Sequence, residues 1–198
     1  MITVVDYGMG NLRNVRRALE SIGCRVLVTP DPEEVKHATT LILPGVGAFG
    51  EAIARIDALG LRAPMLEHAR AGKPMLGICL GMQLLFQDSE ESPGAPGLGL
   101  ITGSVIRFKP GLVVPHIGWN DVVTVAPSAL LAPEGGCFYF VHSFFAGATP
   151  AAVGTTEYGV TFTSVVEQKN VFGVQFHPEK SQTAGIALLR RFAAFDNA

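Results

Sequence analysis

The chain has 198 residues and a formal net charge of −2, with 48% hydrophobic and 16% charged residues. This length suits one compact domain, and the composition is that of a globular chain and excludes a disordered one. The weak net charge and the lack of a Lys/Arg cluster argue against nucleic acid as a partner. No segment approaches the ~20 apolar residues that a membrane span needs, so we expect no membrane insertion either.

Three cysteines, Cys24, Cys79 and Cys137, cannot all pair with one another. No CxxC motif or Cys/His spacing is typical of a metal site, so we expect no metal and no other cofactor. The N-terminus lacks the basic region and cleavage site of a signal peptide. Reduced thiols without a leader favour a cytoplasmic protein.

The first half of the chain alternates short β-branched runs with amphipathic stretches. This order predicts a largely parallel, doubly wound sheet with helices on its faces. Apolar residues of the stretch 11–22 recur at helical spacing, and Asp31 is a candidate helix cap. The predicted strands are 2–5, 25–28, 40–43 and 74–78, and the predicted helices are 11–22, one from Asp31 through Val35, and 51–70 with a break near Gly60.

The second half consists mainly of short strand-like runs after a polar, Pro/Gly-rich loop at 87–99. A helix capped by Ser181, with Ile186, Leu189 and Phe192 on one face, follows them. Nothing between the two halves has the composition of a linker, so we expect residues 1–198 to form a single domain with a mixed, mainly parallel sheet. The predicted strands of this half are 101–108, 121–125, 137–141, 160–166 and 171–176.

Cys79 directly follows the apolar run 74–78 and has Gly77 and Gly81 two residues to either side. This is the cysteine form of a Gly-x-nucleophile-x-Gly turn between a strand and a helix. Small flanking residues allow the close backbone approach and the strained conformation of such a turn. A buried structural cysteine is the competing interpretation, and the paired glycines favour the nucleophile.

His177 and Glu179 follow the predicted strand 171–176, separated by Pro178. Proline favours an extended residue before it, and in an extended segment the two side chains lie on the same side. The carboxylate can then orient the imidazole, which leaves the other ring nitrogen for Cys79. A surface His-Pro turn is the alternative. The order nucleophile, His, Glu also argues against an α/β-hydrolase, in which the acid precedes the histidine.

Two glycine-rich segments follow other strands. In the segment 43–50, closely spaced glycines allow backbone N–H groups to point toward a ligand. Together with the Leu80 N–H they can stabilise an oxyanion. The segment 6–11 has a Gly-x-Gly pair after a strand, but Arg13 stands where a dinucleotide fingerprint needs its third glycine. We therefore reject a dinucleotide site.

The turn around Cys79, from Gly77 to Gly81, is called the elbow below. Together with His177-Pro178-Glu179 it resembles the triad (class I) glutamine amidotransferases, and the similarity spans the whole chain. Their fold implies a flavodoxin-like, doubly wound α/β domain. Within this family the chain is most similar to the glutaminase subunits of imidazole glycerol phosphate synthase. The motifs that narrow the resemblance are DYGMGNL (6–12), PGVGAF (44–49), PHIGWN (115–120), YFVHS (139–143) and HPEKS (177–181).

The resemblance implies that Cys79 is the nucleophile, His177 the base and Glu179 its orienting carboxylate. It implies an oxyanion hole formed by backbone N–H groups of Leu80, Val46 and Gly47. The positions that bind glutamine in the family correspond to Gly45, Gln83, His142, Ser143 and Phe144. One departure from the family pattern is Phe144-Phe145, where tyrosines are common.

The family also implies a partner, a (β/α)₈-barrel cyclase that forms a heterodimer with the glutaminase and receives ammonia through a tunnel. The cyclase combines ammonia with a ribulosyl formimino nucleotide to give imidazole glycerol phosphate and an aminoimidazole carboxamide ribotide in histidine biosynthesis. Asn11, Trp119 and Lys180 lie in family-specific motifs and are our interface candidates. Core packing of Trp119 and a solvated Lys180 are the competing interpretations.

Three other functions remain open at this point. The chain could serve another synthase, such as pyridoxal phosphate synthase, although the HIGWN and HPEKS motifs are not expected there. It could be a non-catalytic interaction module, although an intact Cys79, His177 and Glu179 set argues against this. It could be a stand-alone cysteine peptidase, which would release no glutamate from glutamine.

Overall fold

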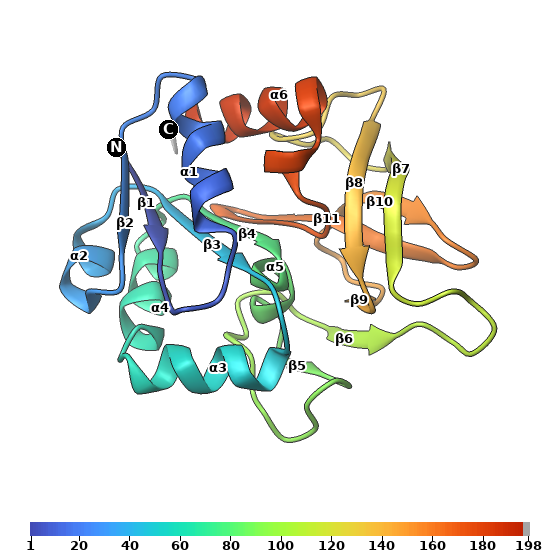
Figure 1. Ribbon diagram of the computed structural model, residues 1–198, viewed down its shortest axis with the longest axis horizontal. Helices are drawn as coiled ribbons and strands as arrows, with labels where there is room; N and C mark the ends of the chain where they lie inside the picture. Colours follow the sequence, from blue (N-terminus) through green and yellow to red (C-terminus); the bar gives the residue numbers. More distant parts are fainter. Residues whose placement is uncertain (196–198) are drawn as a thin grey trace.

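Twelve strands form one mixed sheet in the computed structural model, which describes residues 1–195 (Figure 1). The strand order along the sheet is β2-β1-β3-β4-β12-β11-β10-β7-β8. Its first five members are parallel neighbours, as the alternating strands and helices predict. These parallel strands are β2 (Val26–Thr29), β1 (Ile2–Val5), β3 (Leu41–Gly45), β4 (Met75–Cys79) and β12 (Val171–Val174). The predicted α/β class is confirmed.

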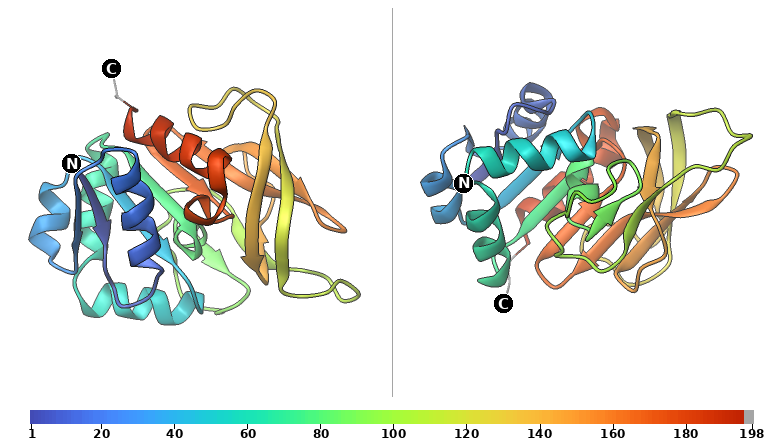
Figure 2. Two further views of the ribbon diagram at one scale, coloured as in Figure 1. Left: turned by 45° about the horizontal axis from the view of Figure 1, so that its top comes forward. Right: turned by 90° about the horizontal axis from the view of Figure 1, so that it is seen from below.

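Helices cover both faces of the parallel strands, which explains why these strands are mostly apolar and do not alternate with polar residues. One core lies beneath α1 (Leu12–Ser21) and α6 (Gln182–Ala193). The second core lies beneath α3 (Phe49–Ala58) and α4 (Arg62–Arg70) on the opposite face (Figure 2). The short helices α2 (Pro32–His37) and α5 (Leu80–Leu84) add Val35 and Leu80 to the second core.

Local signals in the first half agree with the structure. Val15, Ala18 and Leu19 form the buried face of α1. The Asp31 carboxylate accepts a hydrogen bond from the Glu33 N–H, which caps α2 as predicted. The predicted break near Gly60 separates α3 from α4, and Gly60 has φ +69°.

The second half of the chain completes the sheet with antiparallel strands. Along the main path these are β11 (Thr161–Gln168), β10 (Ala152–Glu157), β7 (His116–Thr124) and β8 (Gly136–His142). Three short strands lie off this path, namely β5 (Asp88–Ser89), β6 (Ser104–Arg107) and β9 (Phe144–Ala146).

The strand predictions for this half need correction. β7 begins at His116, whereas the prediction began it at residue 121, and β6 covers only part of the predicted run 101–108. The prediction missed β5, β9 and β10. Two- and three-residue strands are too short for an alternation signal, and Gly118 interrupts the start of β7. β10 has a glycine and register irregularities against β11.

The last three residues of the predicted domain 1–198 lie outside the described part of the chain. None of the helices within residues 1–195 has the length and hydropathy required to cross a membrane.

Candidate active site

Cys79 lies at the sharp turn where β4 ends and α5 begins. Its backbone has φ +55°, a left-handed conformation that is costly for a residue with a side chain. A Cβ on Gly77 would come within 2.5 Å of the Gly81 carbonyl oxygen, and a Cβ on Gly81 would overlap the Leu43 carbonyl oxygen. Both glycines are therefore required by backbone packing, as the elbow pattern predicts.

β12 runs parallel beside β4, so the segment after it reaches the same edge of the sheet as Cys79. There His177 Nδ1 and Glu179 Oε1 are 2.8 Å apart, and both side chains are almost fully buried. His177 is extended as predicted, but Pro178–Lys180 form a 3₁₀ turn where an extended segment was predicted. The turn still brings Glu179 back to the imidazole, so the pairing holds for a different geometric reason.

Ser181 stabilises this turn, whereas the sequence predicted that it caps α6. Its hydroxyl donates to the His177 carbonyl oxygen at 2.6 Å and accepts from the Tyr139 N–H at 3.0 Å. No side chain caps α6. The hydroxyl therefore ties the backbone of His177 to β8.

The electrostatics of His177 favour an ion pair. Burial alone lowers the pKa of the imidazole, because a charged ring is poorly solvated there. The negative charge of Cys79 and the bonded Glu179 carboxylate outweigh burial and raise the pKa of His177 from 6.5 to about 10. The imidazolium form of His177 is therefore favoured in the folded chain.

The Cys79 thiol also makes two long contacts with polar groups of other residues. Cys79 Sγ lies 3.8 Å from the Val141 carbonyl oxygen and 3.8 Å from Gln175 Nε2. Within residues 1–195, His177 Nε2 and Glu179 Oε2 are buried without hydrogen-bond partners. The imidazole nitrogen that faces away from Glu179 is therefore available to a bound ligand, and hydrogen bonds of this kind often tighten only when substrate binds.

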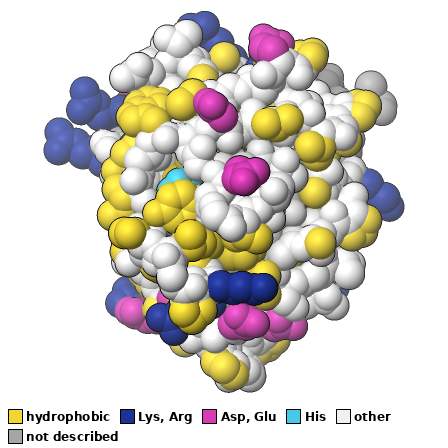
Figure 3. All heavy atoms as spheres, turned by 90° about the vertical axis from the view of Figure 1, so that its right-hand side faces the viewer, with side chains coloured by type: hydrophobic (Ala, Val, Ile, Leu, Met, Phe, Trp, Pro, Cys, Tyr) yellow, Lys and Arg dark blue, Asp and Glu magenta, His cyan; other side chains and the backbone are white. Residues whose placement is uncertain are grey.

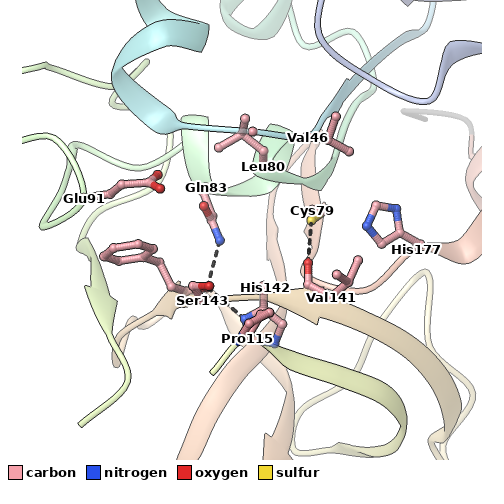
Figure 4. Close-up of a pocket in the computed structure, with 12 residues that line it drawn as sticks. Val46, Cys79, Leu80, Gln83, Glu91, Pro115, Val141, His142, Ser143 and His177 are labelled. Carbon is pink, nitrogen blue, oxygen red and sulfur yellow. Dashed lines mark hydrogen bonds between the residues drawn. The ribbon is translucent and has the colours of Figure 1, made fainter. Parts of the chain in front are cut away.

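A pocket of about 270 Å³ opens beside Cys79 and His177 (Figure 4). All residues predicted for the catalytic triad, the oxyanion hole and glutamine binding line this pocket, except Gly45 and Glu179. Gly45 lies behind the wall, where a Cβ would come within 2.5 Å of the Tyr7 hydroxyl. The lining residues are Val46, Gly47, Cys79, Leu80, Gln83, Glu91, Pro115, Val141, His142, Ser143, Phe144 and His177.

The chain is similar to known proteins over nearly its whole length. The family model for class-I glutamine amidotransferases matches residues 3–194. The imidazole glycerol phosphate synthase subunit HisH of Methanothermobacter thermautotrophicus is 50% identical over 97% of both chains. The subunit HisH of Bacillus subtilis is 46% identical over 97% of this chain and 95% of its own.

The chain belongs to the HisH family of class I glutamine amidotransferases.

Solved structures agree on the fold. A crystal structure of a glutamine amidotransferase matches with a TM-score of 0.76 at 21% identity, covering 97% of each chain. The structure of PurLQS from Thermotoga maritima matches with a TM-score of 0.76 at 20% identity, covering 97% of this chain and 96% of that one. At this identity the likeness concerns the fold alone.

Gln83 lies on the floor of this amidotransferase pocket and is held in place by two acceptors. Its Nε2 donates to the Phe144 carbonyl oxygen at 2.9 Å and to Gln175 Oε1 at 3.0 Å. Gln175 is fully buried next to Cys79. Sequence reasoning missed Gln175, because an inward glutamine at the end of a strand has no local signature.

Glu91 is a second residue that sequence reasoning missed. Figure 4 shows it across the pocket from His177, with Gln83 and Cys79 between them. Its Oε2 accepts a hydrogen bond from the Phe49 N–H at 2.8 Å, at the start of α3. A glutamate in a polar loop is unremarkable in sequence, and only the approach of this loop to α3 makes it part of the site.

The predicted interface residues lie outside the pocket. Trp119 is 48% exposed, so the core-packing interpretation of this residue is wrong. The Lys180 ammonium lies 5.7 Å from the centre of the Tyr139 ring, a cation–π contact at the surface. Asn11 is partly exposed at the start of α1.

No group of three or more His, Cys, Asp or Glu side chains in the described part of the chain is arranged to bind a metal ion.

Proposed function

We propose that this chain hydrolyses L-glutamine to glutamate and ammonia, and that Cys79, His177 and Glu179 carry out the reaction. The ammonia then serves a cyclase that forms imidazole glycerol phosphate in histidine biosynthesis. The family membership supports the reaction and the pathway. The observation that carries the residue assignment is the pairing of a strained cysteine with a buried His177–Glu179 pair in one pocket.

In the first step, the Cys79 thiolate attacks the side-chain amide carbon of glutamine. Negative charge then develops on the former carbonyl oxygen, and backbone N–H groups of Leu80, Val46 and Gly47 stabilise it. The His177 imidazolium donates its proton to the amide nitrogen, the C–N bond breaks, and ammonia leaves. A glutamyl thioester remains on Cys79.

In the second step, His177 is neutral and accepts a proton from water. The resulting hydroxide attacks the thioester carbonyl, and collapse of the tetrahedral intermediate releases glutamate and returns the thiolate. Glu179 holds Nδ1 of His177 in both steps, so that Nε2 is the nitrogen that exchanges the proton.

Glutamine is a zwitterion, and its two charged ends must be recognised away from the reacting amide. Glu91 is the only carboxylate among the lining residues, so we assign the α-ammonium group to its side of the pocket. With the ammonium group there, glutamine extends across the pocket in this proposal and its side-chain amide lies beside Cys79. Ser143, Phe144 and Gln83 contribute the wall between the two ends.

We assign the docking surface for the cyclase partner to the exposed face of β7. Large hydrophobic side chains are concentrated there and in the loop before it, and Figure 3 shows such groups gathered on this side of the molecule. Exposed apolar groups of this kind are typical of interaction surfaces. The exposed residues are Val113, Val114, Ile117, Trp119, Val123 and Val125.

Pro115 lines the pocket and Ile117 lies two residues further along, on this exposed face. A partner bound there would cover the pocket mouth. We propose that the partner is a (β/α)₈-barrel cyclase in a heterodimer and that ammonia reaches it through a tunnel. Direct transfer is chemically sensible, because ammonia in neutral water is mostly protonated and not nucleophilic. Asn11 and Lys180 are the other contact candidates.

The test is glutamate release from glutamine, measured for the chain alone and with the cyclase plus its nucleotide ligand, with Cys79→Ser as control. We expect strong stimulation by the cyclase that depends on Cys79. Glutamate release that is indifferent to the cyclase would point to another synthase. No release under any condition would favour the peptidase or the non-catalytic module.

A further inference from the structure

Two buried histidines in the antiparallel half of the sheet are joined by a short hydrogen bond. His116 begins β7 and His142 ends β8, and their rings meet through His116 Nδ1 and His142 Nε2 at 3.0 Å. Both residues are buried, with 3% and 6% of their surface exposed. The resemblance to the amidotransferase family suggested substrate binding for His142 and no role for His116.

The partners of the two rings determine their tautomers. His142 Nδ1 lies 2.8 Å from the Phe144 carbonyl oxygen, which can only accept, so Nδ1 carries the proton. His142 Nε2 is then an acceptor, and the proton between the rings belongs to His116 Nδ1. His116 Nε2 in turn accepts from Asn120 Nδ2 at 3.3 Å.

Burial keeps both rings neutral, as this pattern requires. It lowers the pKa of His116 and lowers the pKa of His142 to about 3, where His116 and His177 add to the effect. Aromatic rings enclose the pair. His116 stacks between Phe140 and Tyr158, with ring centroids 5.0 and 4.0 Å away.

The hydrogen bonds continue from the histidines to the nucleophile. The Phe144 carbonyl oxygen accepts from both His142 and Gln83 Nε2. Gln83 also donates to Gln175, whose Nε2 lies 3.8 Å from Cys79 Sγ. The same segment contributes the Val141 carbonyl oxygen that contacts this thiol.

We propose that His116 and His142 are positioning residues that hold the Val141–Phe144 wall of the pocket at a fixed place relative to Cys79. The proposal rests on the proposed glutaminase function, since the wall is the one that contacts glutamine. Loss of the hydrogen bond between the two rings leaves a buried polar atom unpaired and releases the Phe144 carbonyl from a fixed orientation.

The placement of β7 gives the pair a second consequence. His116 and Asn120 face inward on this strand, whereas Ile117 and Trp119 face outward on the surface assigned to the partner. A partner that shifts β7 therefore shifts the inward hydrogen bonds as well. The pair connects the docking strand to the pocket wall.

The first test is a direct observation of the two tautomers. Histidine-selective ¹⁵N NMR of the whole chain at neutral pH should show both rings with a protonated Nδ1 and a bare Nε2. Signals are assigned by their loss in His116→Asn and in His142→Asn. A proton on Nε2 of either ring, or an imidazolium form, would overturn the proposal, and this readout does not depend on catalysis.

The second test compares two replacements of His116 in the complex with the cyclase. His116→Leu removes the donor and should raise KM for glutamine about tenfold, equivalent to about 1.4 kcal/mol, with kcat nearly unchanged. His116→Asn offers an amide N–H near the position of Nδ1 and should recover most of the loss. Leucine and asparagine variants with equal KM, whether normal or raised, would contradict the positioning role.

His68 provides the matched control. It is also buried, at 2% exposure, and its Nε2 bonds the Pro74 carbonyl oxygen away from the pocket. His68→Leu should leave KM for glutamine unchanged, and an equal rise in KM would attribute the effect to general loosening. If wild-type chain releases no glutamate, the proposed function fails while the tautomer test still stands.

Discussion

The two halves of the sheet contribute different parts of the site. The parallel half places Cys79 and His177 at the carboxyl ends of two adjacent strands, β4 and β12. The antiparallel half contributes the opposite wall, including Val141 and Phe144, and the exposed strand β7. In Figure 1 the two halves lie side by side, with helices flanking the parallel strands.

This division reflects what each part must do. The proposed nucleophile needs a strained backbone that cannot relax, and a strand buried between two helical layers supplies that rigidity. Docking needs an exposed apolar surface, and β7 offers one because the side chains of Ile117 and Trp119 are 59% and 48% exposed. In the proposed function, reaction chemistry therefore belongs to the parallel half, and partner recognition to the antiparallel half.

The largest expected effect is the loss of glutamine hydrolysis when the proposed nucleophile is replaced. Cys79→Ser should lower glutamine hydrolysis by about 10³-fold or more, since the triad acts as a unit. Partner binding and synthesis driven by added ammonium salts should persist, because the nucleophile serves only the first reaction. The two rates are measured in the cyclase complex with glutamine and with ammonium as nitrogen donor. Loss of both would contradict the division.

The rigidity of the elbow can be tested through its glycines. Gly81→Ala should lower the free energy of unfolding by about 3 kcal/mol, because the added methyl group meets the Leu43 backbone, which cannot give way. Gly94→Ala is the control. Its φ is +87° but nothing lies within 4 Å of its Cβ position, so a loss of only about 1 kcal/mol is expected.

Urea denaturation of the two glycine variants gives both values. A loss at Gly81 no larger than the loss at Gly94 would mean that the backbone around Leu43 can accommodate the added methyl group, and that close packing of the elbow does not explain the requirement for glycine at 81.

The sequence predicted the parallel half well because its signals are local. The β-branched run before Cys79, the flanking glycines and the cap at Asp31 each depend on residues close in the chain. Parallel strands also end at one edge by construction, so the meeting of Cys79 and His177 followed from topology.

The antiparallel half was predicted poorly because its determinants are distant in sequence. β9 is three residues long and exists by pairing with β6 and β11. The bond between His116 and His142 joins residues 26 positions apart, and the bond between Glu91 and Phe49 joins residues 42 positions apart. Contacts between residues so far apart leave no periodic pattern in the sequence.

A smaller effect is expected at the docking surface of the antiparallel half. Trp119→Ala should weaken binding of the cyclase about 30-fold, as expected for a central aromatic contact. Leu59→Ala is matched in exposure, at 42%, but lies at the end of α3 in the parallel half and should leave the affinity unchanged. Titration calorimetry measures both. Equal affinities for the two variants would remove β7 from the interface.

The smallest expected effect concerns pH, where the two halves should act with opposite sign. The pKa of His142 is lowered from 6.5 to about 3, chiefly by burial, so the unfolded chain binds more protons between these values and stability falls as pH decreases through them. The pKa of His177 is raised to about 10, since Cys79 and Glu179 outweigh burial. Its contribution is full below pH 6.5 and is lost as pH rises toward 10.

Free energies of unfolding measured from pH 4 to 10 should therefore pass through a maximum near neutral pH, each histidine adding a slope of about 1.4 kcal/mol per pH unit. His142→Gln should flatten only the acid side, because the antiparallel half then has one fewer neutral ring to protonate. Cys79→Ser should flatten only the alkaline side, because the thiolate is the larger of the charges that hold His177 protonated. A variant that flattened both sides would show that the two histidines titrate as one coupled system, and that the halves of the sheet are not electrostatically separate.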